Sequence, residues 1–462
     1  MMKQLPSWGQ RVAWRATDGR RLLLTLLASP LMTAPVAGQA VPARLSSVSD
    51  PLTIGALYRA VDSASPAIRA AQASALAAAA RVPGTRRLPD PWIQVATMNR
   101  ELPGFGLQVP LGMNQVQLTQ MLPIPGTGKL GLAGQVAQSR ADAELARVSE
   151  SIWEQRNRAA TAFYDLYRAD ATLRVMAESR QLLEGVSRTV TGMYAAGEAK
   201  QSDVLRAQLE VGRMTAQIAD MTSMRRRMAA RLNAVLDRAA NEPTGVPELP
   251  EFPESLPSTD SLTALALASR GTIQAGADQV RAAAAAERLA RRELWPDLEV
   301  GVIYGQQPMQ GGGTDRMLSL MLGASLPIWA GSRQSKMRDE AVALRQMAQA
   351  DLDAMRAETR GRVAELVAEL ERTRQLYTLY RQTLLPQTEA TAASARAGYQ
   401  AGNVDFMTYL DALMTANGYR TEIPRLEAEQ GQSLAELEML TGHPLVAATP
   451  EAYTRAPGGA HE

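Results

Sequence analysis

The 462-residue sequence predicts an α+β protein in which one unit, a helix, two strands and a long helical hairpin, occurs twice. The first observation is a repeated sequence motif: "YAAGEAKQSDVLRAQ" at 194–208 resembles "YQAGNVDFMTYLDAL" at 399–413, with Tyr, Ala, Gly, Leu and Ala at equivalent positions. The second is a pair of alternating strand patterns before each of two helices that exceed ordinary globular lengths. The third is an export signal followed by no apolar stretch of membrane-spanning length. Together they favour an internal duplication.

The composition argues against several classes of function. Basic and acidic residues nearly balance, at 49 against 47, so no bulk charge attracts nucleic acid. The absence of cysteine excludes disulfides, thiolate metal sites and a cysteine nucleophile. Of the two histidines, His443 is best explained as a helix-end residue and His461 lies in the last residues. With no nucleophile elbow, phosphate-binding loop or metal-ligand cluster, we predict no enzyme activity, no cofactor and no metal site.

Residues 1–40 have the pattern of a signal peptide. A basic leader precedes an apolar run at 22–37, which Pro30 and Pro35 interrupt, and the small residues Gly38 and Ala40 follow. The run is too short for a spanning helix. The sequence therefore predicts an exported protein, either soluble or a β-barrel, whose strands give a weaker signal.

The first repeat is expected at 41–250. A helix at 52–81 leads to a strand at about 92–99 and a second at about 114–124, in which Val116, Leu118 and Leu122 alternate with polar residues. No proline occurs between Pro125 and Pro243. That interval predicts a helical hairpin at 129–240, whose first helix would be roughly 95 Å long at 1.5 Å per residue. The proline-rich connector 241–260 follows.

The second repeat is expected at 251–445, before a C-terminal tail at 446–462. Its predicted elements are a helix at 262–292, strands at about 298–305 and 317–328, and a helical hairpin at 331–441. The text "LPIPGTGK" at 122–129 returns as "LPIWAGSR" at 326–333. Pro386 and Pro424 predict kinks that the first hairpin lacks. Gly197 and Gly402 would give the two hairpin turns their backbone freedom.

Four strands are too few to close a barrel alone. Unpaired backbone groups cost several kcal/mol each in lipid, so a sheet that enters a membrane must close. We therefore expect several chains to contribute four strands each, while the long hairpins close a second, helical barrel.

From about Pro51 to Pro444, the duplicated layout, the two turn motifs and the two strand–helix junctions resemble the TolC-like outer-membrane efflux channel family. The resemblance implies a homotrimer with a twelve-stranded β-barrel in the outer membrane and a long α-helical barrel in the periplasm. The connector 241–260 and the segment after Gly442 would join a belt around that barrel. The implied function is passive exit for a resistance-nodulation-division type inner-membrane pump, reached through a periplasmic adaptor. The junction at 120–131 is similar to that of members serving heavy-metal pumps, and without a cysteine after the signal no lipid anchor is expected.

The same resemblance implies a gate of acidic residues just past the second turn. Here the matching text is "TYLDA" at 408–412, so Asp411 keeps one acid and Thr408 replaces the other. A ring of Asp411 carboxylates would favour cations; an exposed carboxylate off the axis is an equal alternative. The adaptor is expected at the hairpin tips, and the strand loops 100–113 and 306–316 outside the cell. The tip residues are Tyr194, Gly197, Glu198, Tyr399, Gly402 and Asn403.

Three other patterns have simpler explanations. The methionines, among them Met193, Met407, Met317 and Met321, suit soft ions but are better explained as packing residues. The basic cluster 224–232 is expected to be a solvated helix face rather than an adaptor-docking surface. The carboxylates Glu365, Glu369 and Glu371 are expected to pair with Arg362 and Arg372. The rival to a channel is a periplasmic adaptor or coiled-coil scaffold without a pore, which would need no detergent.

Overall fold

The computed structural model describes residues 51–98, 113–309 and 313–446. All of them lie in the second of two units into which the chain divides, 1–41 and 42–462. The predicted signal peptide and almost all of the predicted tail therefore fall outside the described residues.

The first half of the chain forms helices and strands close to those that the sequence predicts. Their bounds are α1 (Ile54–Ala64), α2 (Pro66–Thr85), β1 (Trp92–Met98), β2 (Met113–Pro123), α3 (Lys129–Ala195) and α4 (Gln201–Val235). The single helix expected at 52–81 is wrong, because it is broken at Ser65, whose backbone is extended with ψ of 121°. A residue before proline is pushed out of the helical region, and Pro66 begins α2.

The second half repeats the same order of elements. Its bounds are α5 (Thr259–Ser269), α6 (Gly271–Arg292), β3 (Asp297–Pro308), β4 (Thr314–Ala324), α7 (Gln334–Leu379), the π-helical turn η1 (Tyr380–Leu384), α8 (Leu385–Gln400) and α9 (Phe406–Thr441). The single helix expected at 262–292 is likewise broken, at Arg270, where ψ is 123°. At this break Gly271 packs so closely on α3 that a Cβ would lie 2.6 Å from the Ala146 carbonyl oxygen.

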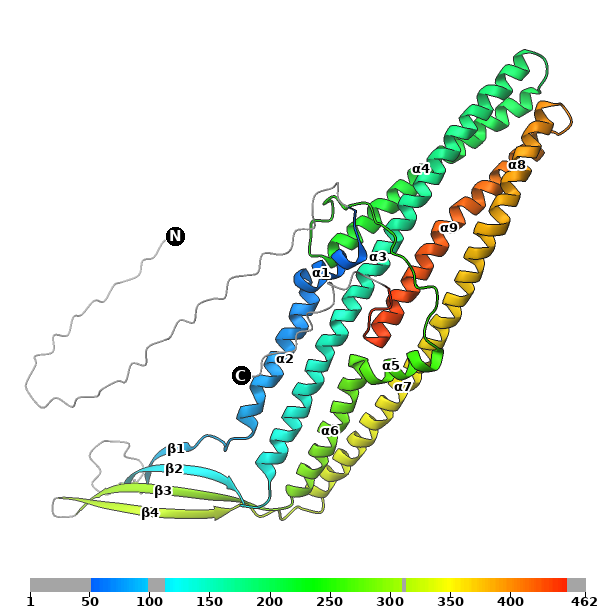
Figure 1. Ribbon diagram of the computed structural model, residues 1–462. Coiled ribbons are helices and arrows are strands. Elements are labelled where there is room, and N and C mark those ends of the chain that lie inside the picture. Colours follow the sequence, from blue (N-terminus) through cyan, green and yellow to red (C-terminus); the bar gives the residue numbers. More distant parts are fainter. Residues whose placement is uncertain (1–50, 99–112, 310–312, 447–462) are drawn as a thin grey trace, which may run out of the picture. The chain divides into compact units, whose positions relative to one another are not determined.

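The four strands form one antiparallel sheet in the order β1-β2-β3-β4 (Figure 1). The central pair, β2 with β3, joins the two halves of the chain, and β1 and β4 are the edges. The loop expected at 306–316 is shorter, because β3 continues to Pro308 and β4 begins at Thr314. The strand expected at 317–328 ends early, at Ala324. The other predicted strand loop lies outside the described residues, except that Met113 begins β2.

The two hairpins differ in continuity. Helix α3 has 67 residues without a break, which corresponds to about 100 Å at 1.5 Å per residue. Helix α7 instead passes into α8 through η1, immediately before Pro386, where a proline removes a backbone donor. Helix α9 runs unbroken through Pro424. Within the described ranges, no helix combines the length and the apolar character that crossing a bilayer requires.

Three apolar clusters hold the helices together. One joins α1, α3, α4 and α9, a second joins the hairpins near their tips, and a third packs α5 and α7 on α9. Beside the third cluster, the buried Glu438 of α9 accepts backbone N–H groups from Leu445 at 2.7 Å and Val446 at 2.9 Å. The Tyr58 hydroxyl of α1 donates to the same carboxylate at 3.2 Å. Burial raises the pKa of Glu438. This carboxylate fixes the end of the described chain against both α1 and α9.

Candidate functional site

The two hairpin tips reverse the chain in the same way. Gly197 and Gly402 are both left-handed, with φ of 79° and 73°. The N–H of Glu198 donates to the Met193 carbonyl at 2.8 Å, and the N–H of Asn403 donates to the Gly398 carbonyl at 2.9 Å. A left-handed residue that closes the last helical turn strongly favours glycine. The structure thus gives the repeated sequence one local geometry.

The tyrosines that the repeat aligns lie in different surroundings. Tyr194 is 47% exposed, whereas Tyr399 is 7% exposed and packs with Phe406 and Tyr409 at centroid distances of 5.5 and 6.0 Å. Tyr399 therefore supports the second tip from inside. Of the six predicted tip residues, the other five are exposed: Tyr194, Gly197, Glu198, Gly402 and Asn403.

The predicted gate residues lie at the start of α9. Asp405 caps this helix, because its carboxylate accepts the Thr408 N–H at 2.9 Å. Hydrogen bonding by Thr408, through its side chain and then its backbone, holds the pKa of Asp405 below its usual range. Thr408 and Asp411 are both exposed and three residues apart, so they share one face of the helix. Within the described residues, Asp411 forms no ion pair, which leaves its carboxylate available to solvent.

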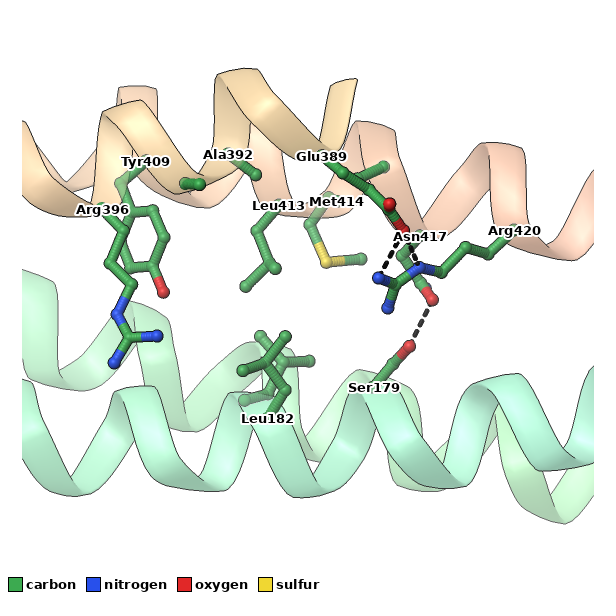
Figure 2. A pocket seen from close by; sticks show the side chains of 13 residues that line it. Ser179, Leu182, Glu389, Ala392, Arg396, Tyr409, Leu413, Met414, Asn417 and Arg420 are labelled. Carbon is green, nitrogen blue, oxygen red and sulfur yellow. Dashed lines mark hydrogen bonds and ion pairs between the residues drawn. The ribbon is translucent and has the colours of Figure 1, made fainter. Parts of the chain in front are cut away.

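A cavity of about 170 Å³ lies between α3, α8 and α9, below the tips (Figure 2). At one end, Arg420 of α9 donates to Glu389 of α8 at 2.8 Å. At the same end, Ser179 of α3 hydrogen-bonds Asn417 of α9. Apolar side chains fill the middle, and Arg396 with Tyr409 lies at the other end. The cavity therefore lies between the two hairpins, and the polar contacts at its end link all three helices.

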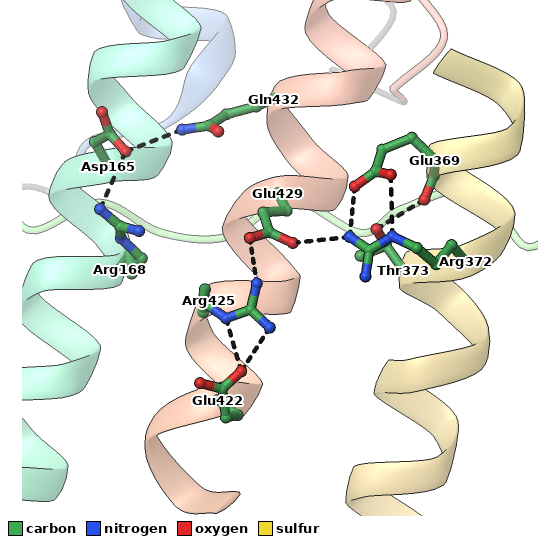
Figure 3. Close-up of polar contacts among 9 residues, drawn as sticks. All are labelled: Asp165, Arg168, Glu369, Arg372, Thr373, Glu422, Arg425, Glu429 and Gln432. Atoms are coloured by element: carbon green, nitrogen blue, oxygen red, sulfur yellow. Dashed lines mark hydrogen bonds and ion pairs between the residues drawn. The ribbon is translucent and has the colours of Figure 1, made fainter. Parts of the chain in front are cut away.

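A second set of polar contacts crosses the helices farther along α9 (Figure 3). Arg425 bridges Glu422 and Glu429 within α9, and Glu429 reaches Arg372 of α7 at 3.4 Å. On the other side, Gln432 donates to Asp165 of α3 at 3.0 Å. These contacts tie α9 to both neighbours.

The expected carboxylate pairing is confirmed for two of three residues. Arg372 donates to Glu369 at 3.0 Å, and this hydrogen bond lowers the pKa of Glu369. Arg362 pairs with Glu365 at 2.9 Å. Glu371 forms no ion pair within the described part of the chain.

The basic cluster 224–232 is more than a solvated face. Arg225 pairs with Asp170 of α3, while Met228 and Leu232 are buried in the first apolar cluster. Arg226, Arg227 and Arg231 are exposed. The expected solvated face is therefore present, while the other side of this stretch packs on α3.

The sheet has one apolar and one largely polar face. Cross-strand partners share a face, so the registers Val116–Tyr304–Leu318 and Leu118–Val302–Leu320 form continuous apolar rows. In the single chain these rows are bare, with Leu320 83% exposed. The opposite face carries Gln115, Gln117, Thr119 and Ser319 among small residues and methionines. A bare apolar surface of this kind marks a contact with lipid or protein.

A buried lysine joins this sheet to the helices. Lys129, the first residue of α3, is 7% exposed, and its ammonium donates to the Asp297 carboxylate at 2.8 Å and the Trp295 carbonyl at 2.9 Å. Glu293 lies 3.6 Å away. No role for Lys129 was predicted from the sequence, although its place at the end of the repeated junction sequence was an available signal.

The chain thus combines a sheet that has one bare apolar face with helical hairpins far longer than a globular core needs. The family model described as outer membrane efflux protein matches residues 262–443. This stretch, in the second half of the chain, is similar to that family.

Solved structures share the fold over most of the chain. CusC, described as forming a transmembrane channel, has 15% identity and a TM-score of 0.73 over 84% of this chain and 92% of its own. The outer membrane protein VceC of Vibrio cholerae has 17% identity and a TM-score of 0.72 over 85% and 96%. A membrane protein from Pseudomonas aeruginosa has 18% identity and a TM-score of 0.74 over 87% and 92%. Among curated proteins, no significant relative is found.

Proposed function

We propose that three copies of this chain form an outer-membrane channel, the passive exit of a tripartite efflux system. A resistance-nodulation-division type pump in the inner membrane would deliver the substrate through a periplasmic adaptor. The chain itself would supply no energy and catalyse no reaction. The junction at 120–131 favours a heavy-metal pump as the partner, with the metal as cargo rather than a resident ion.

The sheet carries this proposal. Its apolar face is bare, and within the described residues neither edge strand, β1 or β4, has a partner on its outer side. In lipid, unpaired edges are too costly, so the sheet must close with other copies into a barrel. Three copies give twelve strands, with the apolar rows outward and the face of Gln117 and Thr119 inward. A scaffold without a pore would have no use for an exposed apolar sheet.

The repeated order of elements supports an internal duplication. Three chains would then place six similar hairpins around one axis and close a helical barrel. The tips, with Tyr194, Glu198 and Asn403 exposed, would meet the adaptor at the periplasmic end. Asp411 and Thr408, just past the second tip, would line the mouth.

The first experiment measures assembly and conductance. We expect detergent-extracted protein to sediment as a homotrimer and to form ion-conducting channels in planar bilayers. A monodisperse monomer that needs no detergent would exclude the channel and support the scaffold alternative.

The second experiment tests the topology in this cysteine-free chain. Glu198→Cys marks the first tip and Gln306→Cys marks β3 near the strand loop. We expect a membrane-impermeant maleimide to label position 306 but not 198 on intact cells. The reverse pattern would invert the proposed orientation.

A further inference from the structure

The two β-hairpins of the sheet have corresponding strand registers. Residues of β1 correspond to residues of β3 that lie 207 positions later, and residues of β2 to residues of β4 that lie 204 positions later. Thus Trp92 opposite Thr119 corresponds to Glu299 opposite Gly323, and the relation holds along the whole of β1. The second offset also aligns the junction texts "LPIPGTGK" and "LPIWAGSR". The repeat therefore predicts contacts residue by residue.

The Lys129 contact has a counterpart whose members are apart in the single chain. By the same offsets, Lys129 corresponds to Arg333 and Asp297 corresponds to Asp90. Lys129 and Asp297 are bonded across the β2–β3 junction. Arg333 and Asp90 lie beside the two opposite edge strands, β4 and β1, and both are exposed. Within the described residues, neither forms an ion pair.

We propose that β4 pairs antiparallel with β1 of a second copy in the β2–β3 register, and that Arg333 there binds Asp90 of the partner subunit. This inference rests on the proposed channel and names its subunit contact. Gly323 would lie opposite Gln94 of the partner subunit, as Thr119 lies opposite Gly301. Leu322 would lie opposite Val95 of the partner subunit, as Leu118 lies opposite Val302.

The chemistry of the faces selects this register. With Leu322 beside the partner's Val95, the apolar rows continue from one copy to the next. A shift by one residue would place the apolar row of one copy beside the polar face of the other, because side chains alternate along a strand. The two edges are thus complementary in pattern as well as in charge.

The junction between copies differs from the internal one in charge. Glu293, the second carboxylate near Lys129, corresponds to Arg86. The Arg86 side chain lies along α3, where a Cβ on Gly134 would meet its Nε at 2.8 Å. Asp90 of the partner subunit is therefore the one carboxylate that the repeat brings to Arg333. Without it, Arg333 would face Arg86 of the partner subunit and be repelled.

Helices α2 and α7, which adjoin the sheet, also have exposed apolar side chains that a second copy could cover. Helix α3 packs against both α2 and α6, whereas α7 packs against α6 and, farther from the sheet, against α5 and α9. On α7, Met347 is more than half exposed, and Leu76 is exposed on α2. A second copy placed by the sheet register would bring its α2 toward α7, as α6 lies against α3.

Disulfide trapping tests the register directly. In the full-length, detergent-extracted protein we expect Gly323→Cys combined with Gln94→Cys to form covalent dimers and trimers on non-reducing gels. The matched control combines Gly323→Cys with Ala96→Cys, on the same face but two residues away, and should give little product. Cross-linking in the control alone would overturn the register. Trimers that cross-link in neither variant would also overturn it while leaving the channel intact, whereas a detergent-free monomer would remove the channel itself.

A charge exchange tests the ion pair. We expect Arg333→Asp to make the trimer dissociate about fivefold faster on heating in SDS, an effect at the upper end for exposed pairs. Adding Asp90→Arg should restore the rate to within about twofold, because opposite charges again face each other. Lys336→Asp, at an exposed site on the same helix, is the control. Equal rates for the single and double exchange would overturn the Arg333–Asp90 pair.

Discussion

Gly431 should be the glycine of α9 that tolerates alanine least. A Cβ there would press on the Tyr164 ring of α3, with Cδ1 2.6 Å away and Cε1 and Cζ closer still. The ring cannot move aside, since it is 1% exposed and packs edge-on against Phe163 at 5.1 Å. Alanine gains about 1 kcal/mol of helix propensity over glycine. Overpacking costs about 1–3 kcal/mol, and the depth of this overlap favours the upper end. The expected net loss is about 1–2 kcal/mol per chain.

Gly418 is the matched control, because it lies on the same helix with no atom within 4 Å of its Cβ position. Gly418→Ala should keep the propensity gain and leave stability equal or higher. The assay is thermal unfolding of detergent-solubilised protein, followed by helical circular dichroism. We expect the midpoint to fall for Gly431→Ala alone, and Tyr164→Leu to recover part of the loss, since contacting residues couple. Equal shifts for the two alanine variants would refute the packing argument.

Three further predictions concern charged groups. Glu438→Gln should keep the backbone hydrogen bonds from Leu445 and Val446, but it should remove the contribution of the Glu438 carboxyl to the pH dependence of stability. Because the folded pKa of Glu438 lies above its ordinary 4.5, its stabilisation is complete below 4.5 and is lost as pH rises through the folded value. The thermal midpoint of the wild type should therefore decrease relative to that of the variant as pH increases. A difference between the two midpoints that does not change with pH would contradict this prediction. Asp411→Ala should reduce cation preference in single-channel recordings, and unchanged selectivity would place the carboxylate off the axis. Lys129→Met should lower the free energy of unfolding by about 2–3 kcal/mol, because it leaves the partly exposed Asp297 carboxylate without its ion-pair partner. A loss of stability no larger than that of the exposed control Lys336→Met would argue against a stabilising role for Lys129.

The long elements were predictable because their signals are local. Alternation in β2 and the absence of proline from 126 to 242 were enough to place β2 and α3 within about one residue. The helix breaks at Ser65 and Arg270 were not predicted, because one long alanine-rich helix and two shorter helices in succession have the same sequence pattern. A proline at a first helical position resembles any helix start.

The candidate site was predictable in position but not in orientation. The repeat located both tips and their left-handed glycines. It aligned Tyr194 with Tyr399, although one is exposed and the other is core, because that outcome depends on how α8 rotates against α9. Lys129 was missed for a related reason. Its partners lie more than 160 residues away, across a strand pairing that no local pattern reveals.

The central pairing of the sheet has a consequence for how the chain is made. Strand β2 ends at Pro123, and its partner β3 begins at Asp297, after the whole first hairpin and the proline-rich connector. During synthesis, the first two strands are therefore complete before their partner strand β3 has been made. Contacts so distant in sequence form slowly, and waiting apolar edges are prone to aggregate. In the proposed channel, folding should therefore depend on completing the second half of the chain before the sheet enters lipid.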